Sequence, residues 1–142
     1  MAGTLPQCVL VVDDDEGVAL TFSRMLRLQG YRVETATNAE TGLALATTHK
    51  PDAIILDLRM PIFGGVEFLR RLRSANTDPA SPAPSVTIVT GDYFIEEPIA
   101  SELRQLGAQV CFKPLWIDDL VDVVARMLAA PPPPADACAQ PS

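Results

Sequence analysis

Residues that can do chemistry stand at the ends of four apolar runs in this chain. They are, in chain order, Asp13, Asp14 and Asp15; Asp57; Thr90 and Gly91; and Lys113. Carboxylates that lie within a few ångströms of one another resist ionisation unless a cation offsets their charge. Mg²⁺ is the natural cation for such a site, because it accepts carboxylate and carbonyl oxygens and keeps some of its waters. If the runs converge, these residues predict a magnesium site.

The same residues suit the transfer of a phosphoryl group. Such transfer is catalysed mainly by positioning and charge compensation, and an aspartate carboxylate can act as the covalent acceptor. The negative charges of Asp13, Asp14 and Asp57 would be balanced by Mg²⁺ together with Lys113. The Thr90 hydroxyl can donate a hydrogen bond to a phosphoryl oxygen. Glycine next to it, at position 91, removes a side chain that would block the approach.

The elements that must position these residues alternate between strand and helix. The apolar pattern predicts strands over 8–12, 32–37, 53–57, 86–92 and 109–114, and helices over 17–30, 39–50, 66–75, 95–108 and 116–130. Such alternation is typical of a doubly wound α/β fold, a parallel sheet with helices on both faces. In this fold ligands bind outside the carboxyl ends of the strands. Strand 32–37 ends in nothing comparable, as expected of an edge strand.

Composition excludes several other classes of function. Eighteen acidic against eleven basic residues give a net charge of −7, which opposes direct binding to nucleic acid and to anionic membranes. No stretch reaches the ~18 apolar residues of a membrane span, and we expect a cytoplasmic protein. Cys8, Cys111 and Cys138 form no CxxC pair, so zinc binding is not expected.

Four motifs resemble those of the receiver domain of two-component response regulators. They are LVVDDDE (10–16), LDLRMPIFGG (56–65), IVTG (88–91) and FKP (112–114). The resemblance covers residues 7–130, and the proline-rich segment 131–142 is expected to be a flexible tail. It implies a flavodoxin-like, five-stranded parallel sheet in the order 2-1-3-4-5 with five helices.

The resemblance also implies a metal site. In family terms Asp14 would be a direct Mg²⁺ ligand and Asp13 would act largely through water. Asp57 would contribute a carboxylate oxygen, and Arg59 would contribute its backbone carbonyl.

For the reaction, the resemblance implies that Asp57 is the phosphoacceptor. Lys113 would contact the phosphoryl group, and Thr90 would be the hydroxyl that responds to it. The Lys113–Pro114 peptide bond would be cis. The side chains of Arg59 and Asp92 are candidates for setting the rate of hydrolysis.

The implied partners are a histidine kinase or a histidine phosphotransfer protein. A downstream protein would bind the face formed by helix 95–108, strand 109–114 and helix 116–130, and a homodimer is a further expectation. The protein would be a signalling switch that catalyses only its own phosphorylation and dephosphorylation. It would not be an enzyme that turns over a free substrate.

The sequence departs from the family where receivers commonly carry an aromatic residue. Three residues before Lys113 stands Val110, and the segment 107–113 is one residue shorter than usual. Phe112 has the same strand parity and could fill some of that space, although ordinary core packing is the simpler expectation for it. Core or rim packing is likewise the default for Trp116, and His49 is expected to be a solvated helix cap.

Two alternatives stay open. A receiver-like docking module would bind partners without being phosphorylated, which the missing aromatic residue favours. An aspartate-nucleophile phosphatase of the haloacid dehalogenase type would use Asp13 and Asp15, followed by Thr90, Lys113, Asp118 and Asp119. That second alternative leaves Asp57 and its Pro/Gly loop without a role. The acidic run itself could also be only a favourable start to the first helix.

Overall fold

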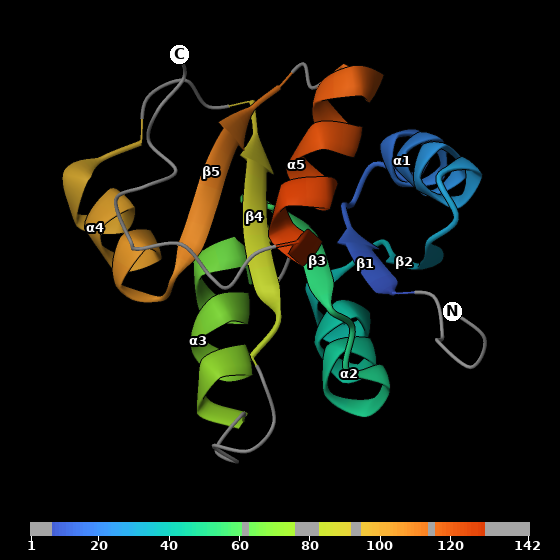
Figure 1. Cartoon of the computed structure of the whole chain (residues 1–142). Coiled ribbons are helices and arrows are strands. Elements are labelled where there is room, and N and C mark those ends of the chain that lie inside the picture. Colours follow the sequence, from blue (N-terminus) through green and yellow to red (C-terminus); the bar gives the residue numbers. More distant parts are fainter. Residues whose placement is uncertain (1–6, 61–62, 76–82, 92–94, 114–115, 130–142) are drawn as a thin grey trace.

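A central parallel sheet organises the molecule, with helices on both faces (Figure 1). The computed structural model describes residues 7–60, 63–75, 83–91, 95–113 and 116–129. The strands are β1 (Cys8–Val12), β2 (Arg32–Ala36), β3 (Ala53–Asp57), β4 (Ser85–Thr90) and β5 (Ala108–Phe112). Their order in the sheet is β2-β1-β3-β4-β5, and all four pairings are parallel. The predicted fold class and strand order are confirmed.

Each strand except β5 is followed along the chain by a helix that crosses to the next strand. The helices are α1 (Glu16–Leu28), α2 (Ala39–His49), α3 (Gly65–Ala75), α4 (Glu97–Gln105) and, after β5, α5 (Ile117–Ala129). Asn38 caps α2, because its side-chain Oδ1 accepts a hydrogen bond of 2.8 Å from the Thr41 backbone N–H. At the other end of that helix, the C-cap residue Lys50 has a left-handed backbone conformation with φ 48°.

The core has two layers, one on each face of the sheet. Because strand side chains alternate, Leu10 and Ile54 point into one layer and Val9 and Ile55 into the other. The first layer is closed by α2, α3 and α4, and the second by α1 and α5. All residues of β1 and β3 are buried, so these two strands form a rigid centre for whatever follows them.

Several predicted boundaries differ from the structure by one to three residues. The fourth helix was predicted over 95–108 and covers Glu97–Gln105, because Gly107 (φ 78°) turns the chain and Ala108 already pairs with β4. The last strand ends at Phe112 instead of 114, and β4 ends at Thr90 instead of 92, where their pairing stops. Asp92, Pro114, Cys138 and the tail 131–142 lie outside the described residues.

No helix within the described ranges is both long and apolar enough to span a bilayer.

Candidate functional site

The sheet brings the predicted site residues to one edge. Asp13 follows β1, and Asp57 ends the neighbouring strand β3, with Val12 paired to Leu56 just before them. On the other side of β3, Thr90 ends β4, and Lys113 directly follows β5. The Lys113 backbone N–H donates a 2.8 Å hydrogen bond to the Thr90 carbonyl, which ties these last two strand ends together.

Three carboxylates form a cluster at this edge. One side-chain oxygen from each of Asp13, Asp14 and Asp57 lies within 4.8 Å of the others. Asp13 is 4% exposed and Asp57 is 8% exposed, whereas Asp14 is open to solvent. We call these three residues, with Lys113, the acidic site.

Lys113 is the cation of the acidic site. Its Nζ donates a hydrogen bond to Asp13 Oδ2 at 3.2 Å and lies 3.8 Å from Asp57 Oδ1. The ammonium group therefore bridges the two buried carboxylates, with the shorter contact to Asp13. One positive charge faces three carboxylates, so the site carries an excess of negative charge.

The surroundings of Asp57 change its pKa. Burial raises the pKa of Asp57 to about 6, and the neighbouring charge of Asp13 adds to the rise. The ammonium of Lys113 and a backbone hydrogen bond from Arg59 act in the opposite direction without cancelling it. Ionised Asp57 is thus held in a setting that disfavours its charge.

The donor set fits a hard divalent cation. Carboxylate oxygens that converge, two of them from buried side chains, provide the ligand type that Mg²⁺ prefers, and exposed Asp14 leaves one side open to water. A cation placed among them would offset the charge of Asp13, which adds to the rise that burial produces in the pKa of Asp57.

Asp15 has a different role from its two neighbours. Its Oδ1 accepts hydrogen bonds from the backbone N–H groups of Gly17 at 2.9 Å and Val18 at 3.2 Å, so Asp15 is the N-cap of α1. Its own N–H donates to Asp13 Oδ1 at 2.9 Å, which helps to orient that carboxylate. Asp118 and Asp119, the acids that the phosphatase alternative needs, lie exposed in the first turn of α5.

Glycines shape the chain that leaves Asp57. A Cβ on Gly64 would lie 2.6 Å from the Leu58 carbonyl oxygen, closer than real Cβ contacts allow. The Gly65 N–H donates to that same carbonyl at 2.8 Å, which closes the turn into α3. The sequence did not lead us to predict that position 64 requires glycine, although the Gly–Gly pair was a signal for a close approach. By contrast, a Cβ on Gly91 would meet no atom of the described residues within 4 Å, so no contact with them requires glycine there.

The two aromatic residues near Lys113 are not core residues. Phe112 is 42% exposed, so the expectation of ordinary core packing for it is wrong. Trp116 is 69% exposed, which excludes core packing and leaves a place at the rim. The physical reason is their position, at and just beyond the end of β5, where the α4-side core layer includes Val110 but not Phe112. Phe112 is paired in register with Thr90, which is itself buried.

His49 and the cysteines lie away from the acidic site. His49, the last residue of α2, lies with its Nδ1 at hydrogen-bond distance, 2.7 Å, from the Glu34 carboxylate, while the cap position belongs to Lys50. Cys8 is a buried free thiol whose pKa is raised by burial, and Cys111 is a partly buried free thiol.

Comparison with known proteins places this geometry in a family. A family model described as the response regulator receiver domain matches residues 9–125. The transcriptional regulatory protein PrrA of Mycobacterium tuberculosis is 46% identical over 120 residues, which are 84% of this chain and 49% of PrrA. The chain thus spans about half the length of that relative.

Two further proteins resemble the chain over nearly their whole length. Sporulation initiation phosphotransferase F of Bacillus subtilis is 27% identical over 121 residues, covering 84% of this chain and 92% of that protein. A CheY-like receiver domain from Methanospirillum hungatei has a TM-score of 0.78 and 25% identity, covering 88% of this chain and 95% of its own. With a family model that spans most of its residues, the chain belongs to the receiver domains of two-component response regulators.

Proposed function

We propose that Asp57 is the phosphoacceptor of this receiver domain. A carboxylate oxygen of Asp57 attacks the phosphorus of a phosphohistidine in line, the new O–P bond forms as the P–N bond breaks, and the released imidazole takes up a proton. At pH 7 most Asp57 side chains are ionised, because their pKa of about 6 lies below that pH. The carboxylate is therefore available as a nucleophile.

The other residues of the acidic site would compensate charge. Lys113, which already contacts Asp13 and Asp57, would neutralise oxygens of the incoming phosphoryl group. Mg²⁺ would be held by Asp14, Asp57 and the backbone carbonyl of Arg59, with Asp13 acting through water, and it would supply positive charge at the phosphoryl oxygens. The supporting observation is the convergence of three carboxylates and one lysine at a single sheet edge.

Thr90 would convert the covalent change into a structural one. Its hydroxyl would donate a hydrogen bond to the phosphoryl group on Asp57. The chain after β4 and helix α4 would shift together with Thr90. The exposed aromatic rings of Phe112 and Trp116 support a role for the α4–β5–α5 face in binding a downstream protein or a second copy of the chain. Hydrolysis of the acyl phosphate, tuned by the exposed Arg59 side chain, would reset the switch.

The proposal places the protein in a two-component pathway in the cytoplasm. The phosphoryl donor would be a histidine kinase or a histidine phosphotransfer protein. The receiver domain would cover residues 7–130, followed by the tail 131–142.

Labelling with radioactive acetyl phosphate in the presence of Mg²⁺ tests the proposal. We expect a hydroxylamine-sensitive label that is absent in Asp57→Ala. The label should not form when EDTA removes the metal before acetyl phosphate is added. Reduction with borohydride would convert the phosphorylated aspartate to homoserine, which mass spectrometry locates in the chain. Homoserine at position 57 would support the switch.

The remaining outcomes separate the alternatives. Homoserine at position 13, with a label that survives in Asp57→Ala, would instead indicate the phosphatase chemistry. No label under conditions where the protein is folded would indicate a docking module that is not phosphorylated.

A further inference from the structure

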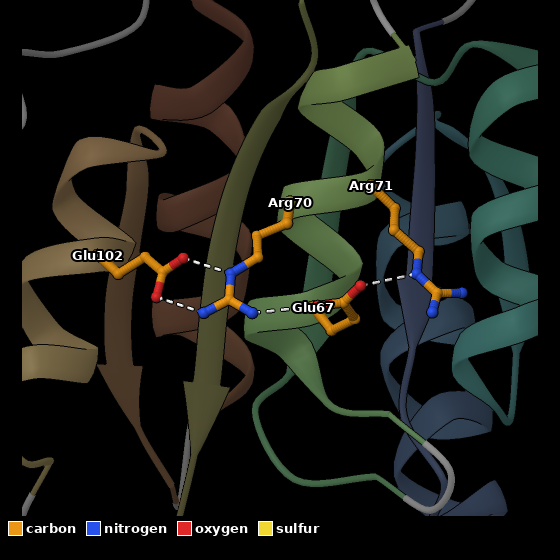
Figure 2. Close-up of polar contacts among 4 residues, drawn as sticks. All are labelled: Glu67, Arg70, Arg71 and Glu102. Carbon is orange, nitrogen blue, oxygen red and sulfur yellow. Dashed lines mark hydrogen bonds and ion pairs between the residues drawn. The ribbon is translucent and has the colours of Figure 1, made fainter.

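Helix α4 is joined to α3 by a cluster of charged side chains on the molecular surface. Figure 2 shows the Arg70 side chain leaving α3 and meeting the Glu102 carboxylate of α4. We call Glu67, Arg70, Arg71 and Glu102 the α3–α4 ion-pair cluster. Both Nε and Nη2 of Arg70 donate to Glu102, with 2.7 Å between Nη2 and Oε1, so the contact is bidentate.

Glu67 fixes the arginine from its own helix. Its carboxylate accepts from Arg70 Nη1 at 3.1 Å and from Arg71 Nε at 2.9 Å. Hydrogen bonds to these guanidinium groups hold the pKa of Glu67 below its ordinary value, and the contact with Arg70 does the same for Glu102. Exposed ion pairs usually contribute little, but bidentate geometry within a network is the situation in which they do contribute.

A second arginine holds the end of the same helix. Arg73, one turn after Arg70 on α3, donates from Nε to the Leu106 carbonyl at 2.9 Å and from Nη1 to the Pro84 carbonyl at 3.1 Å. Leu106 is the C-cap of α4, and Pro84 directly precedes β4. Arg73 therefore anchors the C-terminal end of α4 to the start of β4.

The two ends of α4 are held differently. Leu103, near the C-terminal end, is fully buried in the core, whereas Ile99 in the first turn is only partly buried. At the N-terminal end, the cap residue Glu96 makes no side-chain capping hydrogen bond among the described residues. Within this part of the chain, packing is thus weaker at the N-terminal end of α4, which follows β4 and Thr90 in the sequence.

We propose that Arg70 and Glu102 form a latch that holds α4 against α3 in the unphosphorylated protein, and that α4 pivots about its Arg73-anchored end when the latch opens. The proposal rests on the proposed function, since it specifies how the shift of α4 is opposed. A contact made only in the resting state biases the equilibrium against the phosphorylated state, so loss of the contact favours that state.

Binding of beryllium trifluoride, a phosphoryl analogue, with Mg²⁺ tests the latch in the full chain by calorimetry. Arg70→Gln and Glu102→Gln should each bind the analogue up to about five-fold more tightly than the wild-type protein at ~0.1 M salt. Both should tighten binding although they change the net charge in opposite directions. The double variant should bind no more tightly than either single variant, because both remove the same contact.

Arg104→Gln is the matched control. It makes the same charge change on α4 but breaks only the Arg104–Glu97 pair within that helix, so its affinity should stay at the wild-type value. At ~1 M salt, where the screening length falls to ~3 Å, the difference between Arg70→Gln and the wild-type protein should largely disappear. Hydrogen exchange of the α4 amides should be faster in Arg70→Gln than in Arg104→Gln.

Affinities of Arg70→Gln and Glu102→Gln that match the control, or that fall below the wild-type value, would overturn the latch. If the variants give that result but the wild-type protein is labelled at Asp57, the latch is wrong and the proposed function stands. A wild-type protein that neither binds the analogue nor accepts a label would overturn both proposals.

Discussion

Charge is arranged in opposite ways in the acidic site and in the α3–α4 ion-pair cluster. In the acidic site, two buried carboxylates share one ammonium group, and burial with like charge raises the pKa of Asp57 to about 6. In the exposed cluster, each carboxylate meets a guanidinium group, and the pKa values of Glu67 and Glu102 are lowered. The first arrangement disfavours its own charges and suits a site that accepts a cation. The second favours them and suits a structural contact.

Removal of the Lys113 ammonium group from the acidic site should have the largest effect, which is on the rate of phosphorylation. In Lys113→Met, the rate of labelling by acetyl phosphate with Mg²⁺ should fall by about 100-fold, as when one preorganised donor to a charged transition state is lost. Lys50→Met provides a matched control, since the chain's other lysine is exposed beyond the end of α2. Equal labelling rates in the two variants would show that Lys113 does not compensate charge.

The turn after Asp57 provides the next largest effect. Gly64→Ala should lower the free energy of unfolding by about 1–3 kcal/mol, because the new Cβ overlaps the Leu58 carbonyl oxygen and the turn must move. Gly91→Ala introduces the same group where no atom of the described residues lies within 4 Å, and it should change stability by less than about 0.5 kcal/mol. Urea unfolding of both variants measures the difference. Similar losses at positions 64 and 91 would contradict the close approach.

Neutralisation of Asp57 should stabilise the metal-free protein. Asp57→Asn should raise the free energy of unfolding at pH 7 by about 1–2 kcal/mol, because it removes a charge that the fold disfavours. A carboxyl group with a raised pKa stabilises the fold fully below its unfolded value of 3.8 and loses that contribution as pH rises through about 6. The advantage of the variant should therefore shrink as pH falls from 7 to about 5.

Mg²⁺ provides the control for this prediction. The metal should stabilise the wild-type protein more than Asp57→Asn, because the proposed metal site includes a carboxylate oxygen of Asp57 that the variant lacks. Thermal unfolding with EDTA and with Mg²⁺ would measure both effects. A variant that is less stable than the wild-type protein at pH 7 in EDTA would show that the Asp57 charge is compensated within the protein.

The ion-pair cluster should give the smallest effect, with the opposite sign. Glu67→Gln should slightly destabilise the protein at pH 7, because it removes a charge that Arg70 and Arg71 favour. The pKa of Glu67 is lowered, so its contribution is present above its ordinary value of 4.5 and is lost as pH falls through the lower folded value. The urea midpoints of Glu67→Gln and of the wild-type protein should converge as the pH falls. Added salt should reduce the difference between them at pH 7. A stabilising effect of the variant would contradict the contrast between the two groups of charges.

Much of the fold could be predicted from local pattern. The buried runs of β1 and β3, the alternation of strands with helices and the Asn38 cap depend on neighbouring residues, so the sequence shows them directly. Boundaries at α4 and β5 were less accurate, because they depend on where the pairing of β5 with β4 begins and ends. For the same reason the exposure of Phe112 was not predicted.

The sequence by itself determined which residues we propose to act on a phosphoryl group, since Asp13, Asp57 and Lys113 stand at predicted strand ends whatever their distances. Only the tertiary structure decided how their charges combine. It separates Asp15, a helix cap, from its neighbours and places Lys113 between Asp13 and Asp57. It also brings Arg70 to Glu102, 32 residues away, a contact with no local signal. The physical reason is that charge interactions depend on distance and burial, which the packing of the whole sheet and its helices sets.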